Sequence, residues 1–263
     1  MSQENPFRLD GRVAFLSGAA GHLGREMALA LGGAGASLIL NGRNAARLEA
    51  FAVELKRTGI TAECACFDVM DFERVRQFFD DRTRLDILIN NAVTMEPKSL
   101  AKVTPDDFDR TYRSAVTAAF EAVRAATPAL IRAAEKWGDA SVINIASMYG
   151  FVSPDPKLYS APAQMSPPHY GAAKAALVQL TRHLAAELGE EGVRVNTLSP
   201  GPFPTGEVAM RDPGFAARLA ERTMLGRTGR AAEIAGPVLF LASPASSFVT
   251  GSVLTADGGW TSW

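Results

Sequence analysis

Residues 12–31 read RVAFLSGAAGHLGREMALAL, an apolar run followed by a glycine-rich turn and a stretch with helical periodicity. The run from Arg12 to Ser17 is a candidate buried strand, and the pattern from Leu23 to Leu31 predicts a helix. A strand, a glycine turn and a helix in this order point free backbone N–H groups and a helix dipole at a phosphate. We therefore predict a phosphate-binding turn; the alternative interpretation is an ordinary tight turn.

The alternation of strands and helices continues along the chain. Further apolar runs predict strands at 35–40, 61–67, 85–89, 142–146, 193–198 and 252–256. Helical patterns lie between most of these runs, which predicts a parallel sheet with right-handed crossovers. No repeat, linker or low-complexity stretch is visible, so residues 1–263 are predicted to form a single α/β domain.

The composition argues against several functional classes. The chain is 47% hydrophobic and 21% charged, and its formal net charge of −1 gives no reason to expect a nucleic-acid or membrane partner. No apolar run approaches the ~18 residues of a membrane span, and Met1 to Pro6 lacks secretory features. The two cysteines, Cys64 and Cys66, are interpreted as reduced thiols, and no metal site is predicted. We expect a soluble cytoplasmic protein.

The second predicted strand ends at Asn41, Gly42 and Arg43. In dinucleotide-binding folds, an acidic residue at this point would bind ribose hydroxyls, but no carboxylate is present. Gly42 leaves space and Arg43 supplies a planar cation suited to a 2′-phosphate. This favours NADP(H), with NAD(H) as the second choice. The alternative is that Arg43 only begins the next solvated helix.

Polar residues also follow the third and fourth predicted strands. Asp68 and Val69 come after one, and Asn90, Asn91 and Ala92 after the other. Ligands of parallel sheets bind outside the carboxyl ends of the strands. Asp68 is therefore a candidate acceptor for an adenine amino group, although capping of the next helix is an alternative.

Tyr170 and Lys174 are the candidate acid–base pair. Four residues apart on a helix, they lie on one face, one turn from each other. A neighbouring ammonium lowers the pKa of a phenol toward neutrality, where acid–base catalysis is efficient. Ser147 lies where the strand at 142–146 ends. The alternative is a half-buried aromatic beside a solvated cation.

Two segments near these residues are predicted to be irregular. Five prolines between 151 and 169 predict a long loop over the candidate site, which we call the substrate loop. Glycines and prolines in 201–223 predict an irregular, movable lid. Residues 104–126 form a helix rich in small residues, and Pro128 is expected to interrupt or restart it.

Taken together, these motifs resemble the short-chain dehydrogenase/reductase family over nearly the full chain. The resemblance implies a Rossmann-type doubly wound parallel sheet flanked by helices, and a nicotinamide cofactor. The matching motifs are Ser17-Gly18…Gly24, Asp68-Val69, Asn90-Asn91-Ala92, Ser147, Tyr170…Lys174, Asn196, Pro200-Gly201…Thr205 and Asp257-Gly258-Gly259.

The resemblance also implies roles for single residues. Ser147 would hold the substrate oxygen, Tyr170 would exchange its proton, and Lys174 would bind the nicotinamide ribose and lower the tyrosine pKa. The remaining cofactor-binding positions that it implies are Ser17, Gly18, Ala20, His22, Leu23, Gly24, Arg43, Asp68, Val69, Asn91, Ala92, Pro200, Gly201 and Thr205, the last beside the carboxamide.

Three positions depart from the family pattern. His22 stands at the middle glycine of the turn, and Val93 replaces a glycine after Ala92. Ala115 occupies the helix position where the family often has an asparagine that supports a proton-relay water. Since that water bonds a main-chain carbonyl, we expect a weakened or rerouted relay rather than a dead enzyme.

The expected function is NAD(P)(H)-dependent hydride transfer between the nicotinamide and a secondary alcohol or ketone. The segment 146–150 resembles gluconate 5-dehydrogenase-like and 3-oxoacyl-carrier-protein reductase-like members, so sugar acids, polyols and 3-oxoacyl groups remain open as substrates. A non-catalytic dinucleotide-binding sensor or scaffold is the alternative, and an epimerase or dehydratase is a third. The family usually forms dimers or tetramers through helices matching 105–126 and 171–188, so a homo-oligomer, either a dimer or a homotetramer, is expected. Trp260 and Trp263 are expected to be buried, with another subunit contact as one place for this burial.

Overall fold

The computed structural model describes residues 5–212 and 214–263. The first four residues, which form most of the segment judged to lack secretory features, and Pro213 in the predicted lid lie outside the described residues. The other predicted strands, helices and site residues lie within the described residues.

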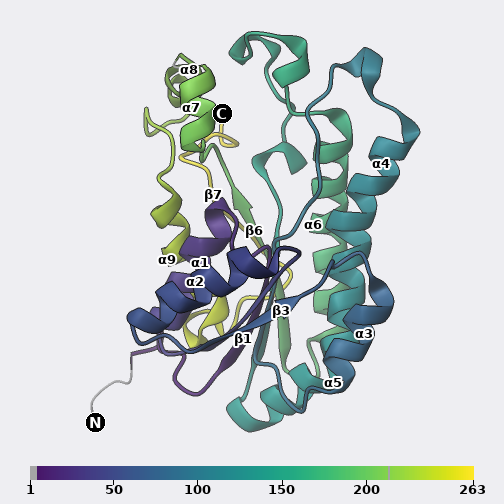
Figure 1. Cartoon of the computed structure of the whole chain (residues 1–263), viewed down its shortest axis with the longest axis vertical. Helices are drawn as coiled ribbons and strands as arrows, with labels where there is room; N and C mark the ends of the chain where they lie inside the picture. Colours follow the sequence, from purple (N-terminus) through teal and green to yellow (C-terminus); the bar gives the residue numbers. More distant parts are fainter. Residues whose placement is uncertain (1–4, 213) are drawn as a thin grey trace.

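Seven strands form one parallel sheet in the order β3-β2-β1-β4-β5-β6-β7 (Figure 1). The order reverses between β1 and β4, and open parallel sheets bind ligands outside the strand ends at such a point. The strands are β1 Val13–Ser17, β2 Ser37–Gly42, β3 Ala62–Cys66, β4 Ile87–Asn90, β5 Ala140–Ile145, β6 Val193–Pro200 and β7 Val253–Ala256.

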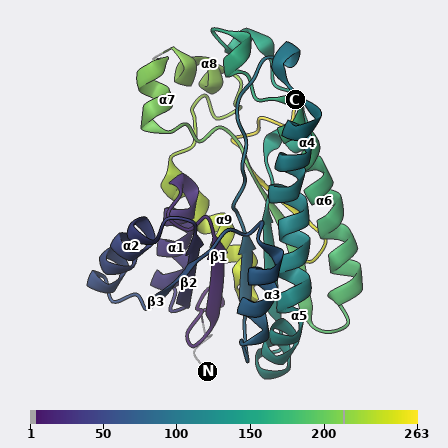
Figure 2. The same ribbon diagram turned by 45° about the vertical axis from the view of Figure 1, so that its right-hand side comes forward.

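Helices cover both faces of the sheet. On one face lie α1 (His22–Gly33), α2 (Ala45–Arg57) and α9 (Ala235–Ala242); on the other lie α3 (Phe72–Asp80), α4 (Pro105–Tyr112), α5 (Ala118–Trp137) and α6 (Pro168–Leu188) (Figures 1 and 2). Successive side chains of a strand point to opposite faces of the sheet. Leu16 therefore packs in the core between the sheet and α1, and Phe15 packs in the core between the sheet and α3 and α5. The predicted doubly wound α/β fold is confirmed.

α4 and α5 form one long helical rod, joined by a π-helical turn at Arg113–Thr117. The prediction that Pro128 interrupts this helix is wrong, because α5 continues through it. A proline removes one main-chain donor, but Ala126, Ala129 and Leu130 on either side are at most 1% exposed and pack into the core. Within the described residues, no helix has the length and apolar character needed to cross a membrane.

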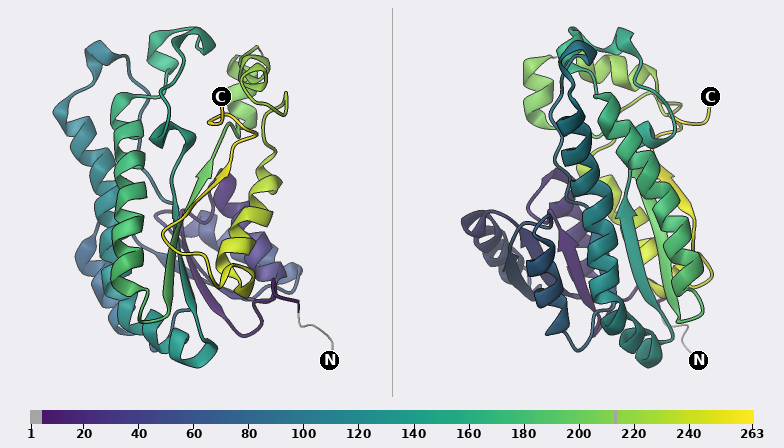
Figure 3. Two further views of the ribbon diagram at one scale, coloured as in Figure 1. Left: turned by 180° about the vertical axis from the view of Figure 1, so that it is seen from behind. Right: turned by 90° about the vertical axis from the view of Figure 1, so that its right-hand side faces the viewer.

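The carboxyl ends of the strands point toward one end of the molecule, where the long connections gather (Figure 3). The substrate loop is irregular as predicted, apart from short 3₁₀ turns, but α6 already begins at Pro168. The prediction that 201–223 is irregular throughout is wrong, since this lid contains α7 (Gly206–Arg211) and α8 (Phe215–Glu221). Gly206 begins α7 and Gly214 immediately precedes α8, so these glycines bound the helices instead of breaking them.

Candidate active site

Ser147, Tyr170 and Lys174 gather just beyond the carboxyl end of β5. Ser147 follows β5 after one residue and is 8% exposed. Pro168 at the first position of α6 suits a helix start, and it brings Tyr170 and then Lys174 one turn later to the strand end. The Lys174 ammonium is 3% exposed and donates a 2.5 Å hydrogen bond to the Ile145 carbonyl. The predicted spatial grouping is therefore present.

The electrostatics of this group differ from the expectation in one respect. Burial lowers the pKa of Lys174 to about 8. Burial raises the pKa of Tyr170, against the opposing effect of the Ser147 hydroxyl as a hydrogen-bond partner. The expectation that the ammonium lowers the Tyr170 pKa is wrong for the protein alone, because desolvation of the phenolate dominates.

The glycine turn between β1 and α1 is closely packed against its neighbours. Gly18 has φ +65°, and a Cβ there would meet the Asn91 Nδ2 at 2.8 Å. A Cβ on Gly24 would collide with the Gly18 carbonyl oxygen, so α1 packs closely on the turn. Gly21, the residue before α1, has no side-chain cap, and the first N–H groups of the helix are available to a ligand.

Ser17 ties this turn to the end of β4. Its hydroxyl accepts hydrogen bonds from the N–H groups of Asn91 (2.9 Å) and Ala92 (3.1 Å), and it is 3% exposed. The Asn91 side chain donates to the main-chain oxygens of Ser17 and Gly18. Ser17 therefore holds the two strand ends together, and its hydroxyl is already engaged within the protein.

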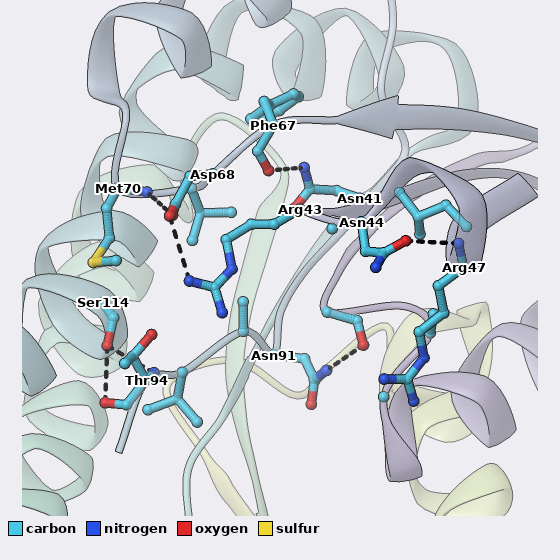
Figure 4. A pocket seen from close by; sticks show the side chains of 18 residues that line it. Asn41, Arg43, Asn44, Arg47, Phe67, Asp68, Met70, Asn91, Thr94 and Ser114 are labelled. Carbon is cyan, nitrogen blue, oxygen red and sulfur yellow. Dashed lines mark hydrogen bonds and ion pairs between the residues drawn. The ribbon is translucent and has the colours of Figure 1, made fainter. Parts of the chain in front are cut away.

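A groove of about 360 Å³ runs across the ends of β1, β2, β3 and β4 (Figure 4). Arg43 is exposed, and its guanidinium lies 3.7 Å from the Asp68 carboxylate. Arg47 projects from the first turn of α2, where Asn44 caps the helix by accepting from the Arg47 N–H at 2.9 Å. The predicted residues that line the groove are Gly18, Ala20, Arg43, Asp68, Val69, Asn91 and Ala92.

Arg47 was not predicted. The available signal was its spacing of four residues from Arg43, at the start of a helix whose N-terminal dipole favours anions. Two guanidinium groups and a helix N-terminus at one end of the groove form a strong anion-binding arrangement.

The other predicted cofactor residues lie outside the lining of this groove. His22, Leu23 and Gly24 are the first three residues of α1. Pro200 is the last residue of β6, and Gly201 follows it directly. A Cβ on Gly201 would collide with the main chain of Asp257, which explains the requirement for glycine. Thr205 caps α7, its hydroxyl accepting from the Val208 N–H at 3.4 Å.

Ala115 lies in the π-helical turn and is 4% exposed. The neighbouring Ser114, which was not predicted, lines the groove and accepts a 3.0 Å hydrogen bond from the Thr94 N–H. One turn earlier, the Thr111 hydroxyl donates to the Thr94 carbonyl and lies 2.9 Å from His169 Nδ1. The π turn thus fixes the loop after β4 at the edge of the groove.

The described part of the chain contains no group of three or more His, Cys, Asp or Glu side chains arranged to hold a metal ion. The functional groups of the site are therefore hydroxyl, ammonium, guanidinium, amide and single carboxylate groups.

Comparison with known proteins gives consistent results. A family model described as Enoyl-(Acyl carrier protein) reductase matches residues 18–261. The chain is 35% identical over 268 residues to galactitol 2-dehydrogenase (L-tagatose-forming) of Cereibacter sphaeroides, covering 100% of both chains.

Solved structures agree with this result. Gluconate 5-dehydrogenase from Burkholderia cenocepacia J2315, in complex with NADP and tartrate, is 32% identical with a TM-score of 0.86 and 98% coverage of both chains. A short-chain type dehydrogenase/reductase from Mycobacterium marinum is 32% identical with a TM-score of 0.87, again with 98% of both chains covered.

Proposed function

The chain belongs to the short-chain dehydrogenase/reductase family, and on this premise we propose that it is an NADP(H)-preferring oxidoreductase that interconverts a secondary alcohol and a ketone. The observation that carries the proposal is the grouping of Ser147, Tyr170 and Lys174 beyond the end of β5, beside the groove across β1 to β4.

The residues of the groove fit a dinucleotide phosphate. Gly18 lacks room for a Cβ because the turn packs closely on Asn91 and Ala92, and the first turn of α1 would offer its N–H groups to a phosphate. Arg43 and Arg47 would hold a 2′-phosphate, and Asp68 would accept from the adenine amino group. NADP bound to the Burkholderia cenocepacia relative supports the same preference here.

The nicotinamide, when bound, supplies the hydride chemistry. The protein orients the reactants and controls the proton. Ser147 would bind the substrate oxygen, and Tyr170 would give its hydroxyl proton to that oxygen in the reductive direction and take it back in oxidation. Lys174 would bind the ribose and compensate the negative charge that develops on Tyr170.

A screen of substrates with both NADPH and NADH tests this function. The purified protein would be incubated with ketones, polyols, sugar acids and 3-oxoacyl thioesters while the absorbance of the reduced cofactor is followed. Turnover with NADPH at higher kcat/KM than with NADH is the expected result. Binding of NADPH without turnover of any substrate would favour the non-catalytic sensor or scaffold, and turnover without net change in the cofactor would favour an epimerase or dehydratase.

We also infer that the protein is a homo-oligomer, with α4, α5 and α6 at a subunit contact. Phe108, Tyr112 and Phe120 are 42%, 50% and 41% exposed along the α4–α5 rod, more apolar surface than a solvated helix needs. Sedimentation velocity tests this inference, since a dimer or tetramer is expected. The cytoplasmic location stays a prediction, which cell fractionation can test.

A further inference from the structure

Two tyrosines outside the catalytic group meet next to it. The hydroxyl oxygens of Tyr149 and Tyr159 lie 2.7 Å apart and share a hydrogen bond. Tyr149 follows Ser147 by two residues, and its N–H donates to the Ser147 Oγ at 3.2 Å. Its carbonyl oxygen packs on Gly171, the residue after Tyr170, where a Cβ would approach to 2.8 Å. The main chain of Tyr149 therefore contacts both the Ser147 hydroxyl and the start of α6 beside Tyr170.

Tyr159 is held in place from the lid. Its ring lies 5.4 Å from the Phe215 ring of α8, and the Arg218 Nε donates to the Leu158 carbonyl at 2.7 Å. The Asp212 carboxylate accepts from both Arg218 and Ser160, each at 2.5 Å. The Arg218–Asp212 ion pair lies within the lid, and hydrogen bonds from this pair to Leu158 and Ser160 join the lid to the substrate loop on both sides of Tyr159.

An apolar cluster supports both rings. Met148, Leu158, Leu219 and Trp260 are 4–5% exposed and pack with Tyr149, Tyr159 and Phe215. The rings therefore have little freedom to turn, so the orientation of the hydroxyl groups is set before any substrate binds. Two hydroxyl groups held in fixed positions favour ligands that complete their hydrogen bonds over ligands that leave them unpaired.

The hydrogen-bond capacity of the pair indicates what it would select. Each phenol has one donor hydrogen and an oxygen that accepts. The bond between Tyr149 and Tyr159 uses one hydrogen, and the Ser166 N–H is a further partner of the Tyr159 oxygen, so one O–H and the remaining acceptor lone pairs are left for a ligand. A ligand hydroxyl, which both donates and accepts, matches this set, whereas an aliphatic chain would leave it unsatisfied.

We propose that Tyr149 and Tyr159 form a specificity-determining hydroxyl pair that selects a polyhydroxylated substrate, a polyol or a sugar acid, over an aliphatic alcohol or a 3-oxoacyl chain. This inference rests on the proposed function and narrows its substrate class. Burial raises the pKa of both tyrosines, so both remain neutral donors throughout the working pH range. A negative charge on Tyr170 would also raise the pKa of Tyr149, after the larger effects of burial and of Tyr159.

The test compares a hexitol and a 2-alkanol as substrates of the wild type and of the Tyr149→Phe and Tyr159→Phe variants. We expect the wild type to prefer the hexitol, and each variant to lower the hexitol-to-alkanol ratio of kcat/KM by at least about tenfold, mainly through KM. Because the two hydroxyls act as a unit, the double variant should lose little more than the worse single variant. Thr83→Val, which removes an exposed hydroxyl before the amino end of β4, is the control and should leave the ratio unchanged.

Two results would overturn the inference while leaving the proposed function intact. One is a wild-type preference for the 2-alkanol or for a 3-hydroxyacyl thioester. The other is an unchanged ratio in both variants, or equal losses on both substrates, which would mean that the tyrosines only support the loop. Absence of wild-type turnover of every substrate would instead remove the proposed function itself, and this inference with it.

Discussion

The Lys174 ammonium nitrogen lies 5.7 Å from the centre of the Tyr170 ring. The ammonium is directed at the Ile145 carbonyl, so it is tied to the end of β5 as well as placed beside the phenol. Among residues 5–212 and 214–263, no carboxylate pairs with this ammonium, and such a buried charge is costly for folding but available for chemistry.

Tyr170→Phe should abolish most turnover and leave NADPH affinity largely intact. The change removes the only proton-exchanging hydroxyl proposed at the substrate oxygen, which is worth about 10²–10⁴ in rate. Initial rates with reduced cofactor and a fluorescence titration with NADPH measure the two effects. Near-normal turnover of the true substrate by this variant would overturn the assignment of Tyr170.

Lys174→Met should stabilise the fold while removing activity. The buried ammonium has a pKa of about 8, against 10.5 in the unfolded chain, so the unfolded state holds the proton more tightly. Its full cost to stability is present below about pH 8 and shrinks as the pH rises toward 10.5. After the loss of the bond to Ile145, a net gain of about 1–2 kcal/mol is expected at pH 7. Urea denaturation at pH 7 and 10 measures it, with exposed Lys157→Met as the control; a less stable variant at pH 7 contradicts the prediction.

Arg43→Ala and Arg47→Ala should each weaken NADPH binding by roughly tenfold or more, because each removes a charge-assisted contact with the 2′-phosphate. Binding of NADH should change little, since it has no such phosphate. Fluorescence titrations with both cofactors measure the difference. Arg57→Ala, at the other end of α2, is the control, and parallel losses with NADPH and NADH would argue against a 2′-phosphate site.

His169 should make stability decrease in acid. The residue is 2% exposed, and within the described structure its Nε2 is buried without a hydrogen-bond partner. Burial lowers its pKa, with Asp107 acting in the opposite direction. The unfolded chain therefore gains a proton first as the pH falls below about 6.5, and stability is lost there. Denaturation at pH 7.5 and 5.5 should show a smaller loss in His169→Gln than in the wild type. His183→Gln, at an exposed position, should behave as the wild type; if His169→Gln does so too, the prediction fails.

Ala115→Asn should shift the pH dependence of kcat, because it restores an amide at the position where a relay water would be bound. The π turn that carries Ala115 is buried at the groove edge, so the added group would lie near the site. A pH–rate profile measures the shift. Ala119→Asn, one turn further along and similarly buried, controls for the added volume, and identical profiles in all three proteins would count against any relay at this position.

Much of the fold could be predicted from local patterns. The apolar runs that became β1, β5 and β6 are short and continuous, because strands covered by helices on both faces are buried on both sides. The errors came from glycine and proline. Pro128 stays inside α5 because the burial of its neighbours outweighs the loss of one main-chain hydrogen bond. In the lid, Gly206 begins α7 and Gly214 immediately precedes α8, so these glycines lie at helix starts and do not make the whole segment irregular. Trp260 is buried as expected, whereas Trp263 is 75% exposed in the single chain, so its burial at a contact with another subunit stays a prediction.

The sequence by itself determined the sheet, the glycine turn and the helical spacing of Tyr170 and Lys174, because each depends on residues within about one element of each other. Only the tertiary structure decided what burial does to the pKa of Tyr170, and which distant groups meet. Examples are Tyr149 with Tyr159, Thr111 with His169, and Ser160 with Asp212. The physical reason is that desolvation and side-chain pairing depend on packing between elements, which periodicity along the chain does not encode.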